Sequence, residues 1–109
     1  MLELWQTEWC PASRRVRERL TELGVDFLAR QVPVEKEHRD ALLAATGVDT
    51  IPVAVVAQHD VLVGETAILD WLVDHVPESD EAEAHRLKAA KARRRYLEEE
   101  CECSQPATR

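Results

Sequence analysis

One cysteine stands where a helix is predicted to begin, and it is the first candidate for chemistry. Cys10 precedes Pro11, and proline is favoured at the first position of a helix because an N–H there would be unpaired in any case. A thiol at a helix amino terminus meets free backbone amides and the positive end of the helix dipole, which both favour the nucleophilic thiolate. Arg14 and Arg15 follow closely and add positive potential. The alternative is a buried Cys10 that packs as a small apolar side chain.

A second candidate is the segment Thr50-Ile51-Pro52, which precedes a predicted strand. Proline has no N–H for a sheet, so it is tolerated mainly at an edge or at the first residue of a strand. The bond between Ile51 and Pro52 can adopt the cis form at modest cost. A cis bond would turn the Ile51 backbone outward, where it can pair with an extended thiol ligand. An ordinary trans proline that opens a strand is the alternative.

The third candidate is Gly64-Glu65-Thr66, in front of another predicted helix. Glu65 suits the ammonium group of an amino-acid ligand, and the free amides of the helix suit its carboxylate. The alternative is a plain cap, in which Glu65 or Thr66 satisfies the first turn of the helix.

The pattern of apolar residues predicts the elements that position these groups. Alternation over residues 2–6 predicts a strand, and apolar residues at helical spacing predict a helix from Pro11 that Gly24 ends. Further elements are expected as a strand over 25–34, a helix over 35–46, a hairpin of strands 51–57 and 61–63, and a helix from Gly64 to Pro77. The buried stripe of that last helix is predicted as Ile68, Leu69, Leu72, Val73 and Val76.

The resulting order, β-α-β-α-β-β-α, predicts an α/β protein with a four-stranded mixed sheet flanked by helices. A charged helix over residues 81–100 is expected to follow as an extra element. Residues 1–77 are interpreted as one domain, and residues 78–109 as a charged helix with a flexible Cys-x-Cys tail.

Composition narrows the class of protein. The 109 residues carry a net charge of −7, which argues against nucleic-acid binding because every phosphate contact needs a Lys or Arg. The longest apolar run covers residues 51–57 and is too short to span a bilayer, so no membrane association is expected. No secretory signal is expected at the amino terminus, and three cysteines do not form a disulfide framework. The sequence therefore predicts a cytoplasmic protein.

Taken together, these segments resemble the glutaredoxins and the amino-terminal domain of the glutathione S-transferases, which share the thioredoxin-like fold. The resemblance covers residues 2–77. The run from Cys10 to Arg17 is similar to the cysteine-type transferase pattern, and the run from Glu65 to Leu72 is similar to a transferase helix opening. The segment Thr50-Ile51-Pro52 looks more like a glutaredoxin.

The resemblance implies a role for each candidate. Cys10 would attack a mixed disulfide, Ile51 and Pro52 would hold the cysteinyl part of glutathione, and Glu65 with Thr66 would hold its γ-glutamyl end. Two further residues, Pro11 and Ser13, would line the same thiol-binding site. Because Ser13 stands where dithiol glutaredoxins carry a second cysteine, the expected mechanism uses a single thiol. Thr7 stands where many glutaredoxins carry a lysine.

The leading hypothesis is a monothiol, glutaredoxin-like thiol-disulfide oxidoreductase that acts on glutathionylated or similar mixed-disulfide proteins. Its co-substrate would be glutathione or an equivalent small thiol, no metal is expected, and the chain would be a monomer or weak dimer. One alternative is a non-catalytic adaptor or iron–sulfur carrier on the same fold. Another is an arsenate-reductase-like protein, suggested by Cys10-x-x-Ser13-Arg14. Conjugation of bulky electrophiles is not expected, since the helical domain that completes a transferase is missing from these residues.

Two cysteines near the carboxyl end, Cys101 and Cys103, admit three interpretations. They can act as a resolving thiol for Cys10, form part of a metal site, or be incidental. Two thiols one residue apart rarely hold a metal without further ligands. Trp9, beside the thiol, is a candidate for the wall of a binding groove.

Overall fold

Four strands form a single mixed sheet in the order β2-β1-β3-β4. The computed structural model describes residues 1–98. Strand β1 (Leu2–Gln6) runs parallel to β2 (Phe27–Gln31) and antiparallel to β3 (Val53–Val55), which pairs in turn with antiparallel β4 (Val61–Val63). The central position of β1 places the residues that follow it, including the cysteine, at the middle of one sheet edge.

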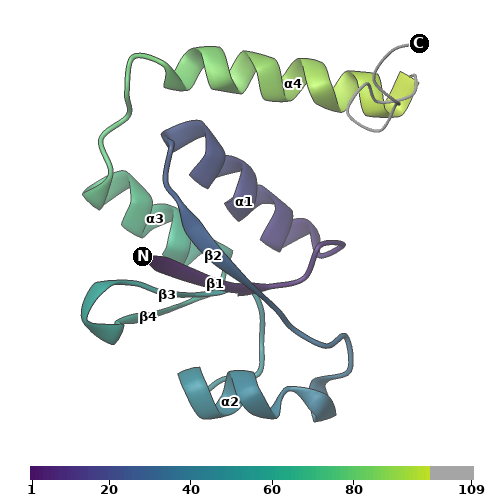
Figure 1. Ribbon diagram of the computed structural model, residues 1–109, viewed down its shortest axis with the longest axis vertical. Helices are drawn as coiled ribbons and strands as arrows, with labels where there is room; N and C mark the ends of the chain where they lie inside the picture. The colour runs from purple at the N-terminus through teal and green to yellow at the C-terminus, as the bar shows by residue number, and fades with distance from the viewer. Residues whose placement is uncertain (99–109) are drawn as a thin grey trace.

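The helices cover both faces of the sheet (Figure 1). Helix α1 (Pro11–Leu23) makes the crossover between the parallel strands and shares one face with α3 (Glu65–His75). Helix α2 (Asp40–Thr46) lies on the other face. Two short 3₁₀ turns complete the elements between β2 and β4: Lys36–His38 and Ala57–His59. The predicted element order and mixed sheet are confirmed.

The larger core lies between the sheet and the two helices α1 and α3. Val16 and Leu20 of α1 are fully buried, as are Ile68 and Leu72 of α3. They pack with Leu2 and Leu4 of β1, Ala54 of β3 and Val56, the residue after β3. This packing holds the amino-terminal ends of α1 and α3 in fixed relation to β1 and β3.

Helix α1 ends in a left-handed glycine cap that also sets the start of β2. Gly24 has φ 70° and ψ 29°, and its N–H donates to the Thr21 carbonyl at 3.1 Å. The N–H of Val25 donates to the Leu20 carbonyl at 2.9 Å, which completes the two bonds of a Schellman motif. Val25 therefore belongs to the cap, and the strand begins later than the sequence predicted.

Other predicted boundaries are also wrong in detail. Strand β2 stops at Gln31 rather than reaching residue 34, because Pro33 has no N–H to donate. The helix predicted over 35–46 divides into a 3₁₀ turn and α2, and Ile51 lies before β3 rather than inside it. Val73, predicted to be buried, is 71% exposed, since the buried arc of α3 is narrower than assumed.

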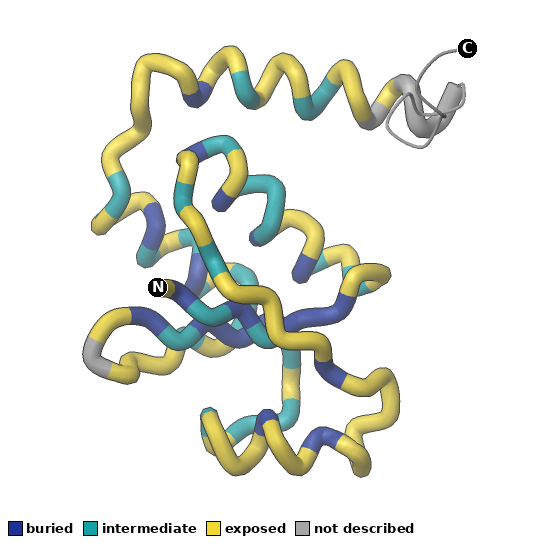
Figure 2. The backbone as a smooth tube through the Cα atoms, in the orientation of Figure 1, coloured by how far each residue is buried: buried dark blue, intermediate teal, exposed yellow. Residues whose placement is uncertain are grey.

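A fourth helix, α4 (Ala82–Glu98), follows at the position predicted for the charged helix. Its first residue, Ala82, is fully buried, and Nδ1 of His85 lies 3.3 Å from the Thr21 carbonyl at the end of α1. Beyond this contact the helix is largely exposed (Figure 2), with Leu87 66% exposed. Among the described residues, none of the helices combines the length and apolar character needed to cross a membrane.

Candidate functional site

Cys10 is the residue that caps the amino terminus of α1. Its backbone is extended (φ −77°, ψ 119°), and its Sγ accepts a hydrogen bond from the Ser13 N–H at 3.4 Å. Its carbonyl accepts the Arg14 N–H at 2.9 Å, and Pro11 occupies the first helical position as predicted. The side chain is partly exposed, so the alternative of a fully buried Cys10 does not hold.

The surroundings of the sulfur favour its anion. Partial burial is the largest single influence and raises the pKa of the Cys10 thiol. The Ser13 hydroxyl, the Ser13 and Ala12 backbone amides and the charge of Arg17 lower it, and together they hold the pKa below its ordinary value. A lowered thiol pKa of this kind favours the thiolate, which is the nucleophilic form of cysteine.

Ser13 contributes through its backbone more clearly than through its hydroxyl. The residue is fully buried, and its Oγ has no hydrogen-bond partner within residues 1–98. The contact with established hydrogen-bond geometry is the one from its N–H to the sulfur. We therefore assign the main part of the Ser13 effect to the amide, which a helix amino terminus supplies whatever the side chain.

The second candidate lies directly beside the end of β1. The Ile51–Pro52 peptide bond is cis, and Pro52 is fully buried. Because Trp5 pairs with Val53 across the antiparallel strands, the Pro52 turn lies next to the residues that lead from β1 to Cys10. The Gly64 N–H donates to the Pro52 carbonyl at 2.9 Å, which joins this turn to the start of α3.

The third candidate is tied to α1 by a paired ionic contact. Arg15 donates from Nε to one carboxylate oxygen of Glu65 at 2.5 Å and from Nη2 to the other at 2.9 Å. The hydrogen bond from Arg15 is the main reason that the pKa of the Glu65 carboxyl lies below its usual value. Glu65 thus directs its carboxylate toward α1 rather than toward the amides of its own helix. Thr66, the next residue, is exposed.

These contacts join the three candidates at one end of the domain. Arg15 lies near the amino terminus of α1 that Cys10 caps, and it binds Glu65 at the first residue of α3. Gly64, just before Glu65, binds Pro52. Trp9, adjacent to Cys10 in the sequence, is 70% exposed. Cys101 and Cys103, the candidates for a resolving thiol, lie outside the described residues.

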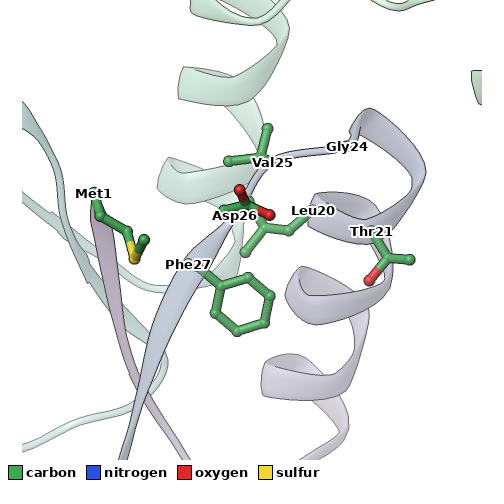
Figure 3. A pocket seen from close by; sticks show the side chains of 7 residues that line it. All are labelled: Met1, Leu20, Thr21, Gly24, Val25, Asp26 and Phe27. Carbon is green, nitrogen blue, oxygen red and sulfur yellow. The ribbon is translucent and has the colours of Figure 1, made fainter.

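A cavity of about 520 Å³ lies elsewhere, toward the carboxyl-terminal end of α1 (Figure 3). It is lined by Met1, Leu20, Thr21, Gly24, Val25, Asp26 and Phe27. The α1 residues in its lining, Leu20 and Thr21, lie at the end of the helix opposite Cys10. The cavity is therefore separate from the thiol site. The described residues contain no group of three or more His, Cys, Asp or Glu side chains that could hold a metal ion.

Two arginines make contacts near the site that the sequence did not predict. Arg39 is 8% exposed and donates to the carbonyls of Pro33, Val34 and Asp49 at 2.7–3.0 Å. Arg17 donates to carbonyls just before Cys10. Because their partners are mostly backbone carbonyls, which every residue carries, no pattern of residue types marks either contact.

The mixed sheet, the helices on both faces and the single thiol at the start of α1 define a thioredoxin-like domain. The family model for the glutathione S-transferase N-terminal domain matches residues 4–80. The chain belongs to this family. Among curated proteins, none matches this sequence.

Solved structures of glutathione S-transferases share the fold. The enzyme from Rhodospirillum rubrum F11 is 30% identical, with a TM-score of 0.61 over 72% of this chain and 35% of that one. The enzyme from Sinorhizobium meliloti 1021 is 27% identical, with a TM-score of 0.63 over 86% and 42%. The enzyme from Methylobacillus flagellatus KT, solved with GSH bound, is 20% identical, with a TM-score of 0.61 over 72% and 39%. The chain thus spans less than half the length of these relatives.

Proposed function

We propose that this protein is a monothiol, glutaredoxin-like thiol-disulfide oxidoreductase that uses Cys10 as the attacking thiol. Its co-substrate is glutathione or an equivalent small thiol, and its substrates are proteins that carry that thiol as a mixed disulfide. The observation that carries the proposal is the position of Cys10 at the amino terminus of α1, where the surrounding amides and Arg17 lower its pKa.

The reaction needs two exchanges at sulfur. The Cys10 thiolate attacks the glutathionyl sulfur of the mixed disulfide, and the protein thiolate leaves and takes a proton from water. A second glutathione, as its thiolate, then attacks the glutathionyl sulfur bound to Cys10. Oxidised glutathione leaves, and the electron pair of the broken bond returns to Cys10 as thiolate. One protein thiol is thereby reduced for each pair of glutathione molecules joined as a disulfide.

The residues around the thiol fit this co-substrate. The cysteinyl unit would pair with the Ile51 backbone next to cis Pro52, and Glu65 with the free amides of α3 suits a γ-glutamyl group. Arg15 holds the Glu65 carboxylate in one orientation before a ligand arrives. The relative from Methylobacillus flagellatus binds GSH, which supports the same class of ligand here.

The presence of Ser13 in place of a second cysteine also favours a single-thiol mechanism. No second cysteine stands three residues after Cys10, so no disulfide forms within this helix turn. Pro11 and Thr66 are exposed beside Cys10 and Glu65, where they would line the bound thiol. We place the reaction in the cytoplasm, whose reducing conditions keep such a thiol available. No step requires a metal, a nucleic acid or a membrane, and a monomer or weak dimer suffices.

The proposal is tested by turnover of a small glutathione mixed disulfide, with glutathione reductase and NADPH to report oxidised glutathione. We expect activity in the intact chain, loss of activity in Cys10→Ser, and retained activity in Cys101→Ser/Cys103→Ser. Glu65→Gln should raise the KM for glutathione more than it lowers kcat. Activity that persists in Cys10→Ser overturns the proposal. A lack of turnover together with visible absorbance after anaerobic purification supports the iron–sulfur alternative instead.

A further inference from the structure

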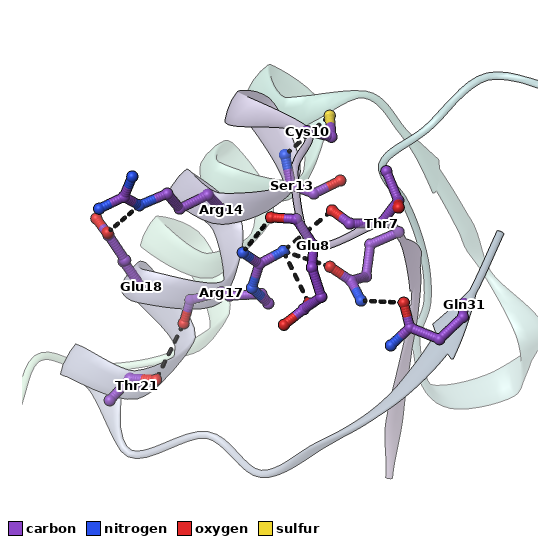
Figure 4. A network of polar contacts seen from close by, with 10 residues as sticks. Thr7, Glu8, Cys10, Ser13, Arg14, Arg17, Glu18, Thr21 and Gln31 are labelled. Carbon is purple, nitrogen blue, oxygen red and sulfur yellow. Dashed lines mark hydrogen bonds and ion pairs between the residues drawn. The ribbon is translucent and has the colours of Figure 1, made fainter. Parts of the chain in front are cut away.

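Arg17 occupies a distinct position beneath the segment that carries the thiol (Figure 4). It lies in the second turn of α1, and its side chain is 20% exposed. Its guanidinium faces the loop between β1 and α1 rather than solvent. It is therefore placed to act on residues 6–9, which lead directly into Cys10.

The guanidinium holds this loop through several contacts at once. Nη1 donates to the side-chain oxygen of Gln6 and to the Thr7 carbonyl at 3.3 Å, and Nη2 donates to the Glu8 carbonyl at 3.1 Å. The carboxylate of Glu8 also lies 3.3 Å from Nη1. One side chain thus binds three consecutive residues: Gln6 at the end of β1, and Thr7 and Glu8 in the loop. The same loop closes on Cys10, whose N–H donates to the Thr7 carbonyl at 3.3 Å.

The network is anchored on its far side by the sheet. Gln6 is fully buried at the end of β1, and its Nε2 donates to Oε1 of Gln31 on β2 at 3.3 Å. In Figure 4, Arg17 lies beside Thr7 and Glu8, and Gln31 lies at the far end of the same network. Arg17 therefore connects α1, the end of β1 and, through Gln6, β2. A shift of its guanidinium would displace the residues that set the position of Cys10.

The charged groups near the sulfur are not equivalent. Arg14 lies on the outer side of α1 and pairs with Glu18 at 3.1 Å, and Arg15 pairs with Glu65. Arg17 is the smallest of the influences that lower the pKa of Cys10, and Arg15 also interacts electrostatically with Cys10, although both carboxylate oxygens of Glu65 bind the Arg15 guanidinium. In the described residues, the carboxylate that Arg17 contacts is that of Glu8, whose side chain is 63% exposed. Water screens an exposed carboxylate strongly, so Glu8 offsets only part of the Arg17 charge.

We propose that Arg17 is a positioning residue for Cys10: it fixes the loop before the thiol, its positive charge at that loop favours the thiolate, and Glu8 moderates this charge. The inference rests on the proposed function, because the step whose rate it would set is the attack by the Cys10 thiolate. It gives a role to Arg17, whereas the sequence suggested added positive potential only from Arg14 and Arg15.

The test compares charge-removing variants in the full chain. The rate of Cys10 alkylation by iodoacetamide is followed against pH, with peptide mass spectrometry to separate Cys10 from Cys101 and Cys103. We expect Arg17→Met to raise the midpoint of this profile and so to lower the thiolate fraction below the midpoint, because the variant loses both the positive charge and the loop contacts of Arg17. Arg17→Lys should restore part of the shift, since it keeps the charge but not the fork of donors.

Two further variants make the test specific. Glu8→Gln should lower the midpoint, because it removes the opposing charge but keeps the Glu8 carbonyl that Arg17 binds. Arg14→Met is the matched control, with an arginine removed from the same helix, and should leave the midpoint unchanged. Equal midpoints in Arg17→Met and Arg14→Met overturn the inference. If Arg17→Met does not fold, the midpoint of Glu8→Gln decides the question. A midpoint in Glu8→Gln that rises or stays unchanged overturns the inference.

This experiment separates the inference from the proposed function. Midpoints that move as expected in a chain without turnover would remove the oxidoreductase proposal and leave the role of Arg17 intact. Turnover by the intact chain, with midpoints that do not move, would remove the role of Arg17 alone.

Discussion

Replacement of Arg39 by methionine should destabilise the domain, because it removes buried hydrogen bonds that join two loops. The Arg39 side chain donates from Nε to the Pro33 carbonyl at 2.8 Å, from Nη1 to the Asp49 carbonyl at 2.7 Å and from Nη2 to the Val34 carbonyl at 3.0 Å. These bonds join the segment after β2 to the segment that leads to Pro52. Methionine keeps much of the apolar stem and removes every donor.

The magnitude follows from these three bonds. A hydrogen bond from a charged donor contributes about 1.5–3 kcal/mol net. The three bonds share one guanidinium, and the freed carbonyls of exposed Pro33 and Val34 can take water, so the total falls well below the sum. We expect a loss of about 2–4 kcal/mol in the free energy of unfolding, out of the 5–15 kcal/mol typical of a domain. At about 4 °C per kcal/mol, Tm should fall by about 8–16 °C.

Urea unfolding followed by tryptophan fluorescence measures this loss. The m value should stay unchanged, since the surface exposed on unfolding is the same. Arg14→Met is the control, because Arg14 is exposed and pairs only along its own helix, and its effect should be much smaller. Arg39→Lys should recover only part of the loss, since one ammonium cannot reach three separate carbonyls. An Arg39→Met chain within about 0.5 kcal/mol of the parent would refute the reasoning.

Three further predictions concern packing, backbone conformation and titration. Leu72→Ala should lower the free energy of unfolding by about 2–5 kcal/mol, whereas Val73→Ala should change it by less than about 0.5 kcal/mol, because only Leu72 is buried. Urea titrations measure both values, and equal effects would contradict the observed core. Gly24→Ala should cost about 1–2 kcal/mol through its φ of 70°, although its Cβ would meet no atom within 4 Å; a thermal melt without a loss of Tm contradicts this. Because the pKa of Cys10 is lowered on folding, its ionisation stabilises the fold fully above the unfolded pKa of about 8.5 and not below the folded pKa. The stability of the parent relative to Cys10→Ala should therefore rise with pH toward that value, and a difference that is flat with pH contradicts the lowered pKa.

The sequence predicted the element order well, because the signals were local and agreed with one another. The proline after Cys10 and the glycine at position 24 mark the two ends of α1, and the spacing of Val16 and Leu20 marks its buried face. Boundaries were less accurate, since they depend on hydrogen bonds that residue types do not reveal. The N–H of Val25 pairs with the helix before it, so a residue typical of strands became part of a cap.

The sequence named the candidate residues of the site but not the contacts that join them. Cys10 and Pro52 are marked by their types, and Glu65 is marked by its place in front of a predicted helix. The contact between Arg15 and Glu65 joins residues 50 positions apart in the sequence, and a run of four arginines in one helix gave no basis for choosing among them. The backbone partners of Arg17 and Arg39 leave no trace in residue types, so only coordinates place those side chains.

The most direct test of a thiolate at the amino terminus of α1 is the midpoint of Cys10 alkylation against pH, measured in the native chain and again in concentrated urea. The account predicts a native midpoint below the unfolded one, which should lie near the free-thiol value of about 8.5. A native midpoint equal to the unfolded one, or above it, would show that burial outweighs the amides and Arg17, and would contradict the assignment of Cys10 as the reactive thiol.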